Sequence, residues 1–281
     1  MIVFNHRDSL SNALLPFRQH KKIGLVPTMG ALHNGHLAII KQALEDNDCV
    51  VVSIFVNPTQ FDNKTDLLKY PRNLDLDVHL ISKLKGIIFV YAPEASNLYC
   101  GNIVSKNYSF GNIENEMEGK YRKGHFNGVG TVVNLLFRAV LPDCAYFGEK
   151  DFQQLQIVRK LVEIEKLSME IVGCPIVRED SGLAMSSRNK RLSATQLEAA
   201  ILINKTLQEV KQKFDNLSIS KLNELVQDRF LNNEHLKLEY FEIANVKTLK
   251  TAKHKFKKID YRAFIAVFVG KVRLIDNLAL N

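Results

Sequence analysis

Residues 23–45, IGLVPTMGALHNGHLAIIKQALE, decide the fold of this chain. The short apolar run at residues 23–27 predicts a buried strand, and a glycine-bearing turn leads from it into a helical pattern over residues 36–45. The next apolar run, residues 49–56, is continuous and β-branched, which is typical of a central parallel strand covered on both faces. Strand, helix and strand in this order predict one unit of a parallel sheet.

The same alternation continues through the first two thirds of the chain. We expect further strands at residues 87–91 and 144–147, and helices at residues 74–84, 129–141 and 153–164. This order predicts an α/β fold with a Rossmann-like, doubly wound parallel sheet and helices on both faces. The loops after its strands then meet at the carboxyl edge, where such folds bind ligands. No GxGxxG follows the first strand and no GxxxxGK(S/T) occurs, which argues against a dinucleotide fingerprint and a P-loop.

The pattern changes after about residue 180. We expect helices at residues 193–214 and 222–231, and strands at residues 237–243, 263–269 and 272–275. These elements predict a smaller α+β module. The change in pattern places the boundary near residues 173–180, so we expect one domain over residues 1–175 and a second over residues 176–281.

The net charge of +8 is confined to one part of the chain. Residues 1–181 contain 20 basic and 20 acidic side chains, so the whole excess of 38 Lys+Arg over 30 Asp+Glu lies in residues 182–281. Its densest run is Lys253, Lys255, Lys257 and Lys258, which we interpret as solvated surface. A basic nucleic-acid-binding protein is one possible reading of this excess. The chain has no Trp and no basic stripe rich in aromatic residues, which argues against it.

Composition and cysteine spacing indicate a soluble protein of a reducing compartment. Hydrophobic residues make up 46% and charged residues 24%, and no run of about 18 apolar residues suggests a membrane span. The four cysteines form no CxxC pair, and Cys49, Cys144 and Cys174 lie in or beside apolar runs, so we expect these three to be small buried side chains rather than disulfides or a zinc site. The N-terminus lacks the apolar core of a signal peptide, and we therefore expect a cytoplasmic protein.

Two histidines, His33 and His36, stand where the turn after the first strand becomes a helix. At this spacing both imidazoles face the same way, above the unpaired N–H groups and positive dipole end of the first turn. Polyphosphate is the expected ligand there, and Gly35 leaves room for a purine or ribose. A histidine pair could stabilise charge at an α-phosphate in its five-coordinate transition state. An isolated HxxH could equally be a surface or buried structural pair, but its place after the first strand favours function.

Four other polar loops are expected at or near the same edge. They are NPTQF at residues 57–61, YRKGHFNG at 121–128, GEKDFQQ at 148–154 and MSSRN at 185–189. Gln60 can both donate and accept, as a hydroxy acid would require. Lys150 could neutralise phosphate, and Arg188 could grip a leaving pyrophosphate. Taken singly, these segments could instead be a proline turn, a solvated basic loop, a surface turn and a polar linker.

Together with the HxGH turn, these segments resemble one family. PTMGALHNGH, SIFVNPTQF, KYPRN, EGKYRKGHFNGVGTVVN, PDCAYFGEKDFQQL, IVREDSGLAMSSRN and VRLIDN occur in order between about residues 23 and 277. The set looks like the pantothenate synthetases, or pantoate–β-alanine ligases, of the HxGH nucleotidyltransferase superfamily. HxGH alone would indicate only that wider superfamily, so another HxGH nucleotidyltransferase, transferring AMP or CMP to a phosphorylated acceptor, is the closest alternative.

The resemblance implies an ATP-dependent ligation in two steps. Pantoate would attack the α-phosphate of Mg-ATP to give pantoyl adenylate and pyrophosphate, and the amine of β-alanine would then displace AMP to give pantothenate. It also implies a nucleotide-binding first domain, a smaller lid domain and a homodimer. The small-molecule substrates are pantoate, β-alanine and ATP, with Mg²⁺ as the metal and no nucleic-acid or membrane partner.

The resemblance also assigns residues. His33, His36, Lys150 and Arg188 would be catalytic, with His36 the candidate proton donor, while Gln60 and Gln154 would bind pantoate and Gln60 also β-alanine. ATP would contact Met29, Gly30, Ala31, Leu32, His33, Asn34, Gly35, His36, Gly148, Glu149, Lys150, Asp151, Val177, Met185, Ser186, Ser187 and Arg188. Met185–Arg188 would be the mobile phosphate-binding segment, analogous to the KMSKS loop of class I aminoacyl-tRNA synthetases. Arg122 and His125 match family positions near the active site.

The chain departs from the family pattern at a few positions. Lys123 stands where the family usually has proline, and Leu135 where it usually has lysine. Tyr99-Cys100 replaces the usual Tyr-Pro. Residues 62–66 lack the glycine-acidic run common after Gln-Phe. For the metal, Asp75 and Asp77 are the candidates, and we expect Asp77 to be a Mg²⁺ ligand. Both could instead be carboxylates at the start of a helix, and Mg²⁺ often binds mainly through phosphates and water.

Overall fold

A computed structural model describes residues 2–61, 67–68 and 70–281. The departure at residues 62–66 therefore lies outside the described residues. The chain divides into two compact units. The first comprises Met1–Glu114, Arg122–Glu149 and Gln154–Pro175, and the second comprises Asn115–Tyr121, Lys150–Gln153 and Ile176–Asn281. Two short inner segments, one of which contains Lys150, thus belong to the unit built from the later part of the chain.

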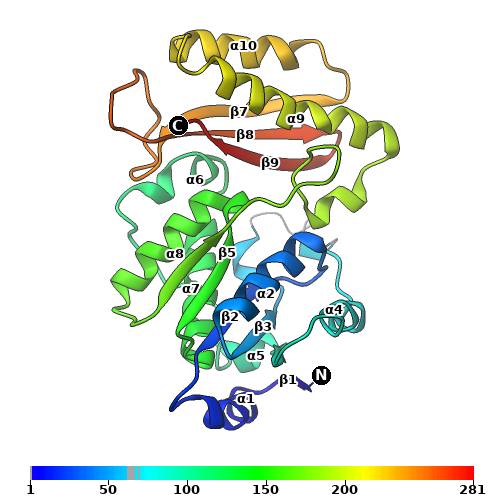
Figure 1. The fold of residues 1–281 in the computed structure, drawn as a ribbon, viewed down its shortest axis with the longest axis vertical. Coiled ribbons are helices and arrows are strands. Elements are labelled where there is room, and N and C mark those ends of the chain that lie inside the picture. The colour runs from blue at the N-terminus through cyan, green and yellow to red at the C-terminus, as the bar shows by residue number, and fades with distance from the viewer. Residues whose placement is uncertain (1, 62–66, 69) are drawn as a thin grey trace. The chain divides into compact units, whose positions relative to one another are not determined.

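The described residues of the first unit form a six-stranded parallel sheet in the order β1-β4-β3-β2-β5-β6. The strands are β1 Ile2–Phe4, β2 Ile23–Thr28, β3 Cys49–Ile54, β4 Ile88–Tyr91, β5 Cys144–Gly148 and β6 Glu170–Cys174. The helices of this part of the chain are α1 Arg7–Leu14, α2 Asn34–Asp46, α4 Leu74–Ile81, α5 Ala95–Leu98, α7 His125–Val140 and α8 Phe152–Ile164 (Figure 1). Short 3₁₀ turns occupy Leu15–Phe17, Pro58–Gln60, Ile113–Asn115, Glu149–Asp151 and Ser187–Arg191.

The strand order confirms the doubly wound sheet and locates its switch point. The chain runs from β2 through β3 to β4 in one direction, then returns to add β5 and β6 on the other side of β2. Ligands of such folds bind where this direction reverses, outside the carboxyl ends of the strands. The reversal lies between β2 and β5, and these are the two strands followed by the HxGH turn and by Gly148-Glu149.

The core of the first unit explains why its central strand reads as a continuous apolar run. Cys49, Val50, Val51 and Val52 of β3 are all fully buried, because neighbouring strands and helices cover both faces. Burial also raises the pKa of the Cys49 thiol to about 11, as expected for an unreactive buried cysteine.

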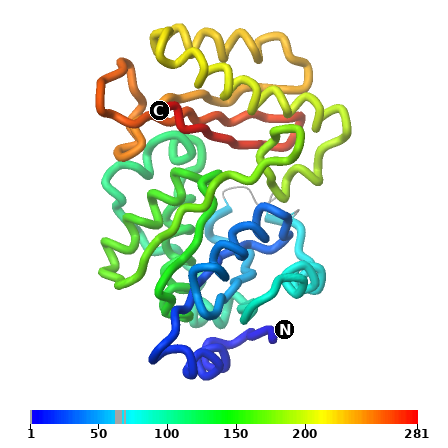
Figure 2. The backbone as a smooth tube through the Cα atoms, viewed as in Figure 1, coloured from blue at the N-terminus to red at the C-terminus, as the bar shows by residue number. Residues whose placement is uncertain are grey.

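The second unit contains an antiparallel sheet in the order β7-β8-β9, with β7 Leu236–Asn245, β8 Tyr261–Val269 and β9 Val272–Ala279. Helices α9 Ala194–Lys213 and α10 Ile219–Leu231 pack along this sheet, and the short α6 Glu118–Tyr121 belongs to the same unit (Figure 1). The backbone trace shows β9 (red) at the sheet edge, beside β8 (Figure 2). Ser193 and Gln196 form a capping box at the start of α9, which confirms the predicted helix start.

The basic run at residues 253–258 is only partly the solvated surface that we expected. Lys255 Nζ donates to the carbonyl oxygens of Phe214 and Leu217, and it lies 5.0 Å from the centre of the Phe214 ring. This cation satisfies the Phe214 carbonyl at the C-cap of α9 and the Leu217 carbonyl in the loop before α10. Lys255 is therefore a helix cap, while Lys253, Lys257 and Lys258 are exposed. In the described part of the chain, no helix has the length and apolar character needed to cross a membrane.

Candidate active site

The turn after β2 has a left-handed backbone. Gly30 and Ala31 have φ values of 76° and 52°, a region in which Ala is strained and Gly is not. Thr28 anchors the start of this turn, because its Oγ1 donates to the Ser53 carbonyl at 2.8 Å and accepts the Gly30 N–H at 3.2 Å. The turn is thus tied to the adjacent strand β3.

Asp77 holds the same turn from a distant part of the sequence. Its Oδ2 accepts the Ala31 N–H at 2.9 Å and its Oδ1 accepts the Leu32 N–H at 2.7 Å. The side chain lies in the first turn of α4 and is 3% exposed. A Cβ atom at Gly30 would come within 2.9 Å of Asp77 Oδ2, so glycine also makes room for this contact. A buried carboxylate that accepts two N–H groups fixes the turn's conformation.

His33 and His36 form the predicted side-by-side pair at the start of α2. Their ring centres are 4.0 Å apart and the rings are tilted by 39°. His33 Nδ1 accepts the Gly35 N–H at 3.2 Å, and His36 Nδ1 accepts the His33 N–H at 3.3 Å, which gives a capping box made of two imidazoles. Neutral rings that accept at Nδ1 carry their proton on Nε2. The backbone therefore selects the tautomer in which each Nε2 is a hydrogen-bond donor.

Gln60 lies beside this turn. It ends the 3₁₀ turn Pro58–Gln60, is 9% exposed, and its Nε2 contacts the sulfur of Met29. The fully buried Asn57 donates to Gln60 Oε1 at 3.3 Å and to the Gly128 carbonyl at 3.1 Å. His125 Nδ1 lies 2.9 Å from the Gln60 carbonyl oxygen. The structure thus brings the NPTQF loop, the HxGH turn and the start of α7 together, as the sequence predicts.

Gly128 allows helix α7 to approach the NPTQF loop closely. A Cβ atom at this position would lie 2.5 Å from the Thr59 carbonyl oxygen. The Tyr99 hydroxyl supports the same loop, since it donates to Asn57 Oδ1 at 2.7 Å. Burial raises the pKa of Tyr99, which keeps the hydroxyl a donor. The sequence indicated Asn57 only as part of the NPTQF loop and did not indicate its contact with Tyr99, because a spacing of 42 residues carries no periodic signal.

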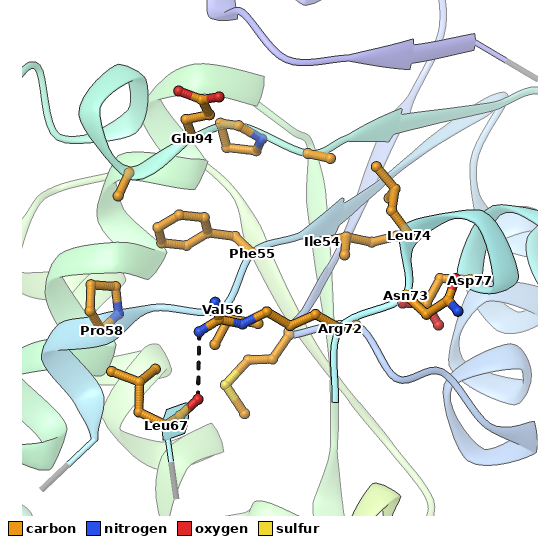
Figure 3. Close-up of a pocket in the computed structure, with 15 residues that line it drawn as sticks. Ile54, Phe55, Val56, Pro58, Leu67, Arg72, Asn73, Leu74, Asp77 and Glu94 are labelled. Carbon is orange, nitrogen blue, oxygen red and sulfur yellow. Dashed lines mark hydrogen bonds between the residues drawn. The ribbon is translucent and has the colours of Figure 1, made fainter. Parts of the chain in front are cut away.

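A pocket of about 460 Å³ opens beside Met29, Gly30 and Asp77. Figure 3 shows apolar side chains of β3 and the following loop, including Ile54, Phe55 and Pro58, on its walls. Its other lining residues are Val56, Leu67, Arg72, Asn73, Leu74, Ala92, Pro93, Glu94 and Ala95. The turn that carries the histidine pair therefore forms part of the wall of a cavity large enough for a small organic molecule.

In the second unit, Val177 and Met185–Arg188 lie on a hairpin and the turn after it. The Met185 N–H donates to the Val177 carbonyl at 3.0 Å, and Arg178 and Ala184 form an antiparallel bridge. This brings together two residues that the family resemblance assigns to ATP. Ser186 then caps the 3₁₀ turn Ser187–Arg191 through the Arg188 N–H, at 3.2 Å.

The segment after β5 continues into the second unit. Lys150 lies in the 3₁₀ turn Glu149–Asp151, with its Nζ 3.8 Å from an oxygen of Asp151. Gln154 lies in the first turn of α8 and is half-buried. The predicted site residues therefore fall into two sets: the HxGH turn, Gln60, Gly148, Glu149 and Gln154 belong to the first unit, while Lys150, Asp151, Val177 and Met185–Arg188 belong to the second.

The described residues contain no group of three or more His, Cys, Asp or Glu that could hold a metal ion. Each carboxylate oxygen of Asp77 accepts a backbone N–H, so the structure gives this residue a task in the turn. Asp75, two positions earlier on the same helix, is exposed. A metal role for Asp77 stays a prediction.

Comparison with known proteins connects this geometry to one family. The family model described as pantoate-beta-alanine ligase matches residues 2–279. The chain is 55% identical to the pantothenate synthetase of Christiangramia forsetii and 52% identical to that of Flavobacterium psychrophilum, in each case over the full length of both chains. Its fold matches the pantothenate synthetase of Thermus thermophilus with a TM-score of 0.91 at 35% identity, covering 100% of this chain and 99% of the other. It also matches a pantoate-beta-alanine ligase from Francisella tularensis, complexed with beta-gamma ATP and beta-alanine, with a TM-score of 0.81 at 37% identity, covering 100% and 98%.

Proposed function

Since this chain belongs to the pantoate-beta-alanine ligase family, we propose a residue-level mechanism for the ATP-dependent ligation of pantoate and β-alanine. In the first step, a pantoate carboxylate oxygen bonds to the α-phosphorus of ATP and the bond to the β-phosphate oxygen breaks, which gives pantoyl adenylate and pyrophosphate. In the second step, the amine of β-alanine bonds to the acyl carbon, AMP leaves, and the amine loses a proton. The products are pantothenate and AMP.

The histidine pair carries this proposal. His33 and His36 use Nδ1 to accept backbone N–H groups, so the neutral rings carry their proton on Nε2, and we assign this N–H to the phosphates. Charge grows on the phosphate oxygens in the transition state, and donors fixed in advance stabilise it without reorganisation. His36 is the proposed hydrogen-bond donor to the leaving pyrophosphate, through its Nε2–H, and it keeps this proton. Met29, Gly30, Ala31, Leu32, Asn34 and Gly35 complete the ATP contacts of this turn.

Gln60 and Gln154 are the proposed pantoate ligands. The amide of Gln60 can donate to one pantoate oxygen and accept from a hydroxyl, and it is set in place by Asn57. We assign β-alanine to Gln60 as well, because the amine must reach the acyl carbon of the pantoyl group already held there. Fixed orientation of two small reactants is a main source of rate in such a reaction.

The second unit supplies the remaining cations. Lys150 and Arg188 would neutralise the phosphates, Ser186 and Ser187 would donate to them, and Gly148–Asp151 with Val177 and Met185 would hold adenine and ribose. Two anions, ATP and pantoate, must approach each other, so cations at the phosphates offset their repulsion. We also propose that the second unit acts as a lid over bound ATP.

We propose that Mg²⁺ binds together with ATP. The described residues do not supply a protein-made cage, so Mg²⁺ would bind mainly through the phosphates and water, with Asp77 as the candidate protein ligand. When bound, it would neutralise phosphate charge. No step is assigned to it.

Isotope exchange tests the reaction class. We expect label from pyrophosphate to enter ATP when pantoate is present and β-alanine is absent, because the first step is reversible on its own. AMP release should then require β-alanine. An HxGH nucleotidyltransferase acting on a phosphorylated acceptor would show no pantoate-dependent exchange, and that result would refute the proposal.

We also propose that the enzyme is cytoplasmic and forms a homodimer, in keeping with the family resemblance. Light scattering behind a sizing column should give twice the chain mass of 32.0 kDa, and a mass of one chain at assay concentration would contradict it.

A further inference from the structure

Asn277, on the last strand of the second unit, holds the backbone of Lys150. Its Nδ2 donates to the Lys150 carbonyl oxygen at 2.8 Å, and its Oδ1 accepts from Nη1 of Arg262. Asn277 is 1% exposed and Arg262 is 8% exposed. Both ends of the Asn277 amide are therefore engaged inside the unit, and the amide plane cannot rotate without breaking a buried hydrogen bond.

The neighbouring Asp276 fixes the position of Asn277. Asp276 Oδ1 accepts the Asn277 N–H at 2.8 Å, and the carboxylate receives two bonds from the Arg178 guanidinium, at 2.7 and 3.0 Å. Arg178 also donates to the Gly182 carbonyl at 3.1 Å, across the hairpin that pairs Val177 with Met185. The adjacent residues Asp276 and Asn277 thus tie the Lys150 segment and this hairpin to one strand.

The segment that carries Lys150 has further contacts within the same unit. The Arg262 guanidinium carbon lies 4.0 Å from the centre of the Phe152 ring, and the rings of Phe152 and Phe264 are 6.0 Å apart. Gln153, 4% exposed, donates to the Glu116 carbonyl at 2.7 Å. Packing around Phe152 holds the segment after Lys150, while the Asn277 side chain donates a hydrogen bond to the carbonyl of Lys150 itself.

We propose that Asn277 is a positioning residue that sets Lys150 for the phosphates of ATP. This inference rests on the proposed role of Lys150 in ATP binding. Asn277 itself is not proposed to contact substrate. It acts through the backbone of Lys150, because a shift in that carbonyl moves the Cα from which the lysine side chain extends. Misplacing a catalytic group by about 1 Å can reduce a rate by about a hundredfold.

A double-mutant cycle tests this coupling. Asn277→Ser removes the amide donor, and Lys150→Ala removes the amine. We expect Asn277→Ser to slow pantoate-dependent pyrophosphate exchange by about tenfold to a hundredfold, and to have little further effect once Lys150 is already Ala. The same cycle, read by calorimetric binding of α,β-methylene-ATP, serves where the exchange rate of a variant falls below detection. Additive effects in both measurements would overturn the inference.

Asn223→Ser is the matched control. Asn223 makes the same kind of bond in the same unit, from Nδ2 to the Ile219 carbonyl at 2.8 Å, within helix α10. Asn223→Ser should lower stability without changing the rate of pyrophosphate exchange. In combination with Lys150→Ala, the exchange rate should therefore equal that of Lys150→Ala alone. If Asn277→Ser fails to fold, Asn277→Asp, which keeps the acceptor for Arg262 and removes the donor, takes its place.

The cycle also separates two kinds of failure. Normal exchange and normal nucleotide binding by Lys150→Ala would refute the proposed role of Lys150. An impaired Lys150→Ala combined with an unimpaired Asn277→Ser would refute only the positioning role of Asn277.

Discussion

The Nδ1 atom of His36 accepts the backbone N–H of His33 at 3.3 Å. This bond does two things at once. It satisfies a backbone donor at the start of α2, and it commits the proton of a neutral His36 ring to Nε2. The helix start and the proposed chemistry therefore depend on the same imidazole, and a substitution there affects both.

Replacing His36 with Ala should lower kcat for adenylate formation by about 10²–10³, or about 3–4 kcal/mol of lost transition-state stabilisation. Pantoate-dependent pyrophosphate exchange measures this directly. His79→Ala, which removes an exposed histidine from α4, should leave exchange unchanged. Turnover near wild type in the His36 variant would exclude the proposed role.

Replacing Asp77 with Asn should loosen the turn at Ala31 and Leu32, because a carboxylate oxygen that accepts an N–H becomes an amide that cannot. Hydrogen bonds to charged groups contribute about 1.5–3 kcal/mol each, so we expect a loss of roughly that size in unfolding free energy. Exchange should fall as well.

Titration with Mg²⁺ decides between the two readings of Asp77. If it only holds the turn, the variant should need no more Mg²⁺ than the parent for half-maximal exchange. A higher requirement would identify Asp77 as a metal ligand. Asp75→Asn, an exposed neighbour on the same helix, is the control for a general loss of negative charge.

Replacing Glu118 with Gln should destabilise the second unit. Its carboxylate accepts two bonds from Arg273, at 2.7 and 2.8 Å, and one from the Tyr240 hydroxyl at 2.8 Å, in a site where Glu118 is 7% exposed. Breaking a buried pair usually costs about 3–5 kcal/mol, but Arg273 keeps Glu239, so we expect about 2–3 kcal/mol. Urea unfolding measures it. Glu116→Gln, whose partner Lys120 is exposed, should cost less than about 1 kcal/mol.

Glu165 makes the unfolding free energy of the protein depend on pH in the acid range. Lys106, with Arg138 and Tyr108, lowers its pKa from 4.5 to about 2. A carboxyl whose pKa is lower in the folded state stabilises the fold above pH 4.5, and this contribution is lost as the pH falls towards 2. The difference in unfolding free energy between the parent and Glu165→Gln should therefore be constant near pH 7 and shrink below pH 4.5. A difference that grows with acid would contradict it.

The hydrophobic pattern was sufficient to predict the strands and helices that have long, regular apolar runs. The strand at residues 49–56 was clear because every side chain from Cys49 to Val52 is buried. The strand Ile2–Phe4 was missed because three residues carry no period, and Glu170–Cys174 was missed because it lies at the sheet edge and is mostly half-exposed. Helix α7 begins at His125, four residues before the predicted start, since Gly124 has φ 77° and the polar first turn faces the Gln60 loop.

The site was predictable where its residues are neighbours in sequence. His33 and His36 form their pair within one helical turn, so spacing alone indicated their geometry. The partners that fix them could not be found in this way: 46 residues separate Ala31 from Asp77, and 127 separate Lys150 from Asn277. Such contacts arise from chain topology, which pattern analysis of one sequence does not contain.

The order in which residues are made differs from the order in which they find partners. Lys150 and Phe152 leave the ribosome long before β8 and β9, yet they contact Asn277 and Phe264 on those strands. During synthesis these contacts must therefore wait for a later part of the chain. A fragment ending at residue 175 would keep the strands of the parallel sheet but leave Lys150 and Phe152 without these partners, and so would be a poor substitute for the first unit.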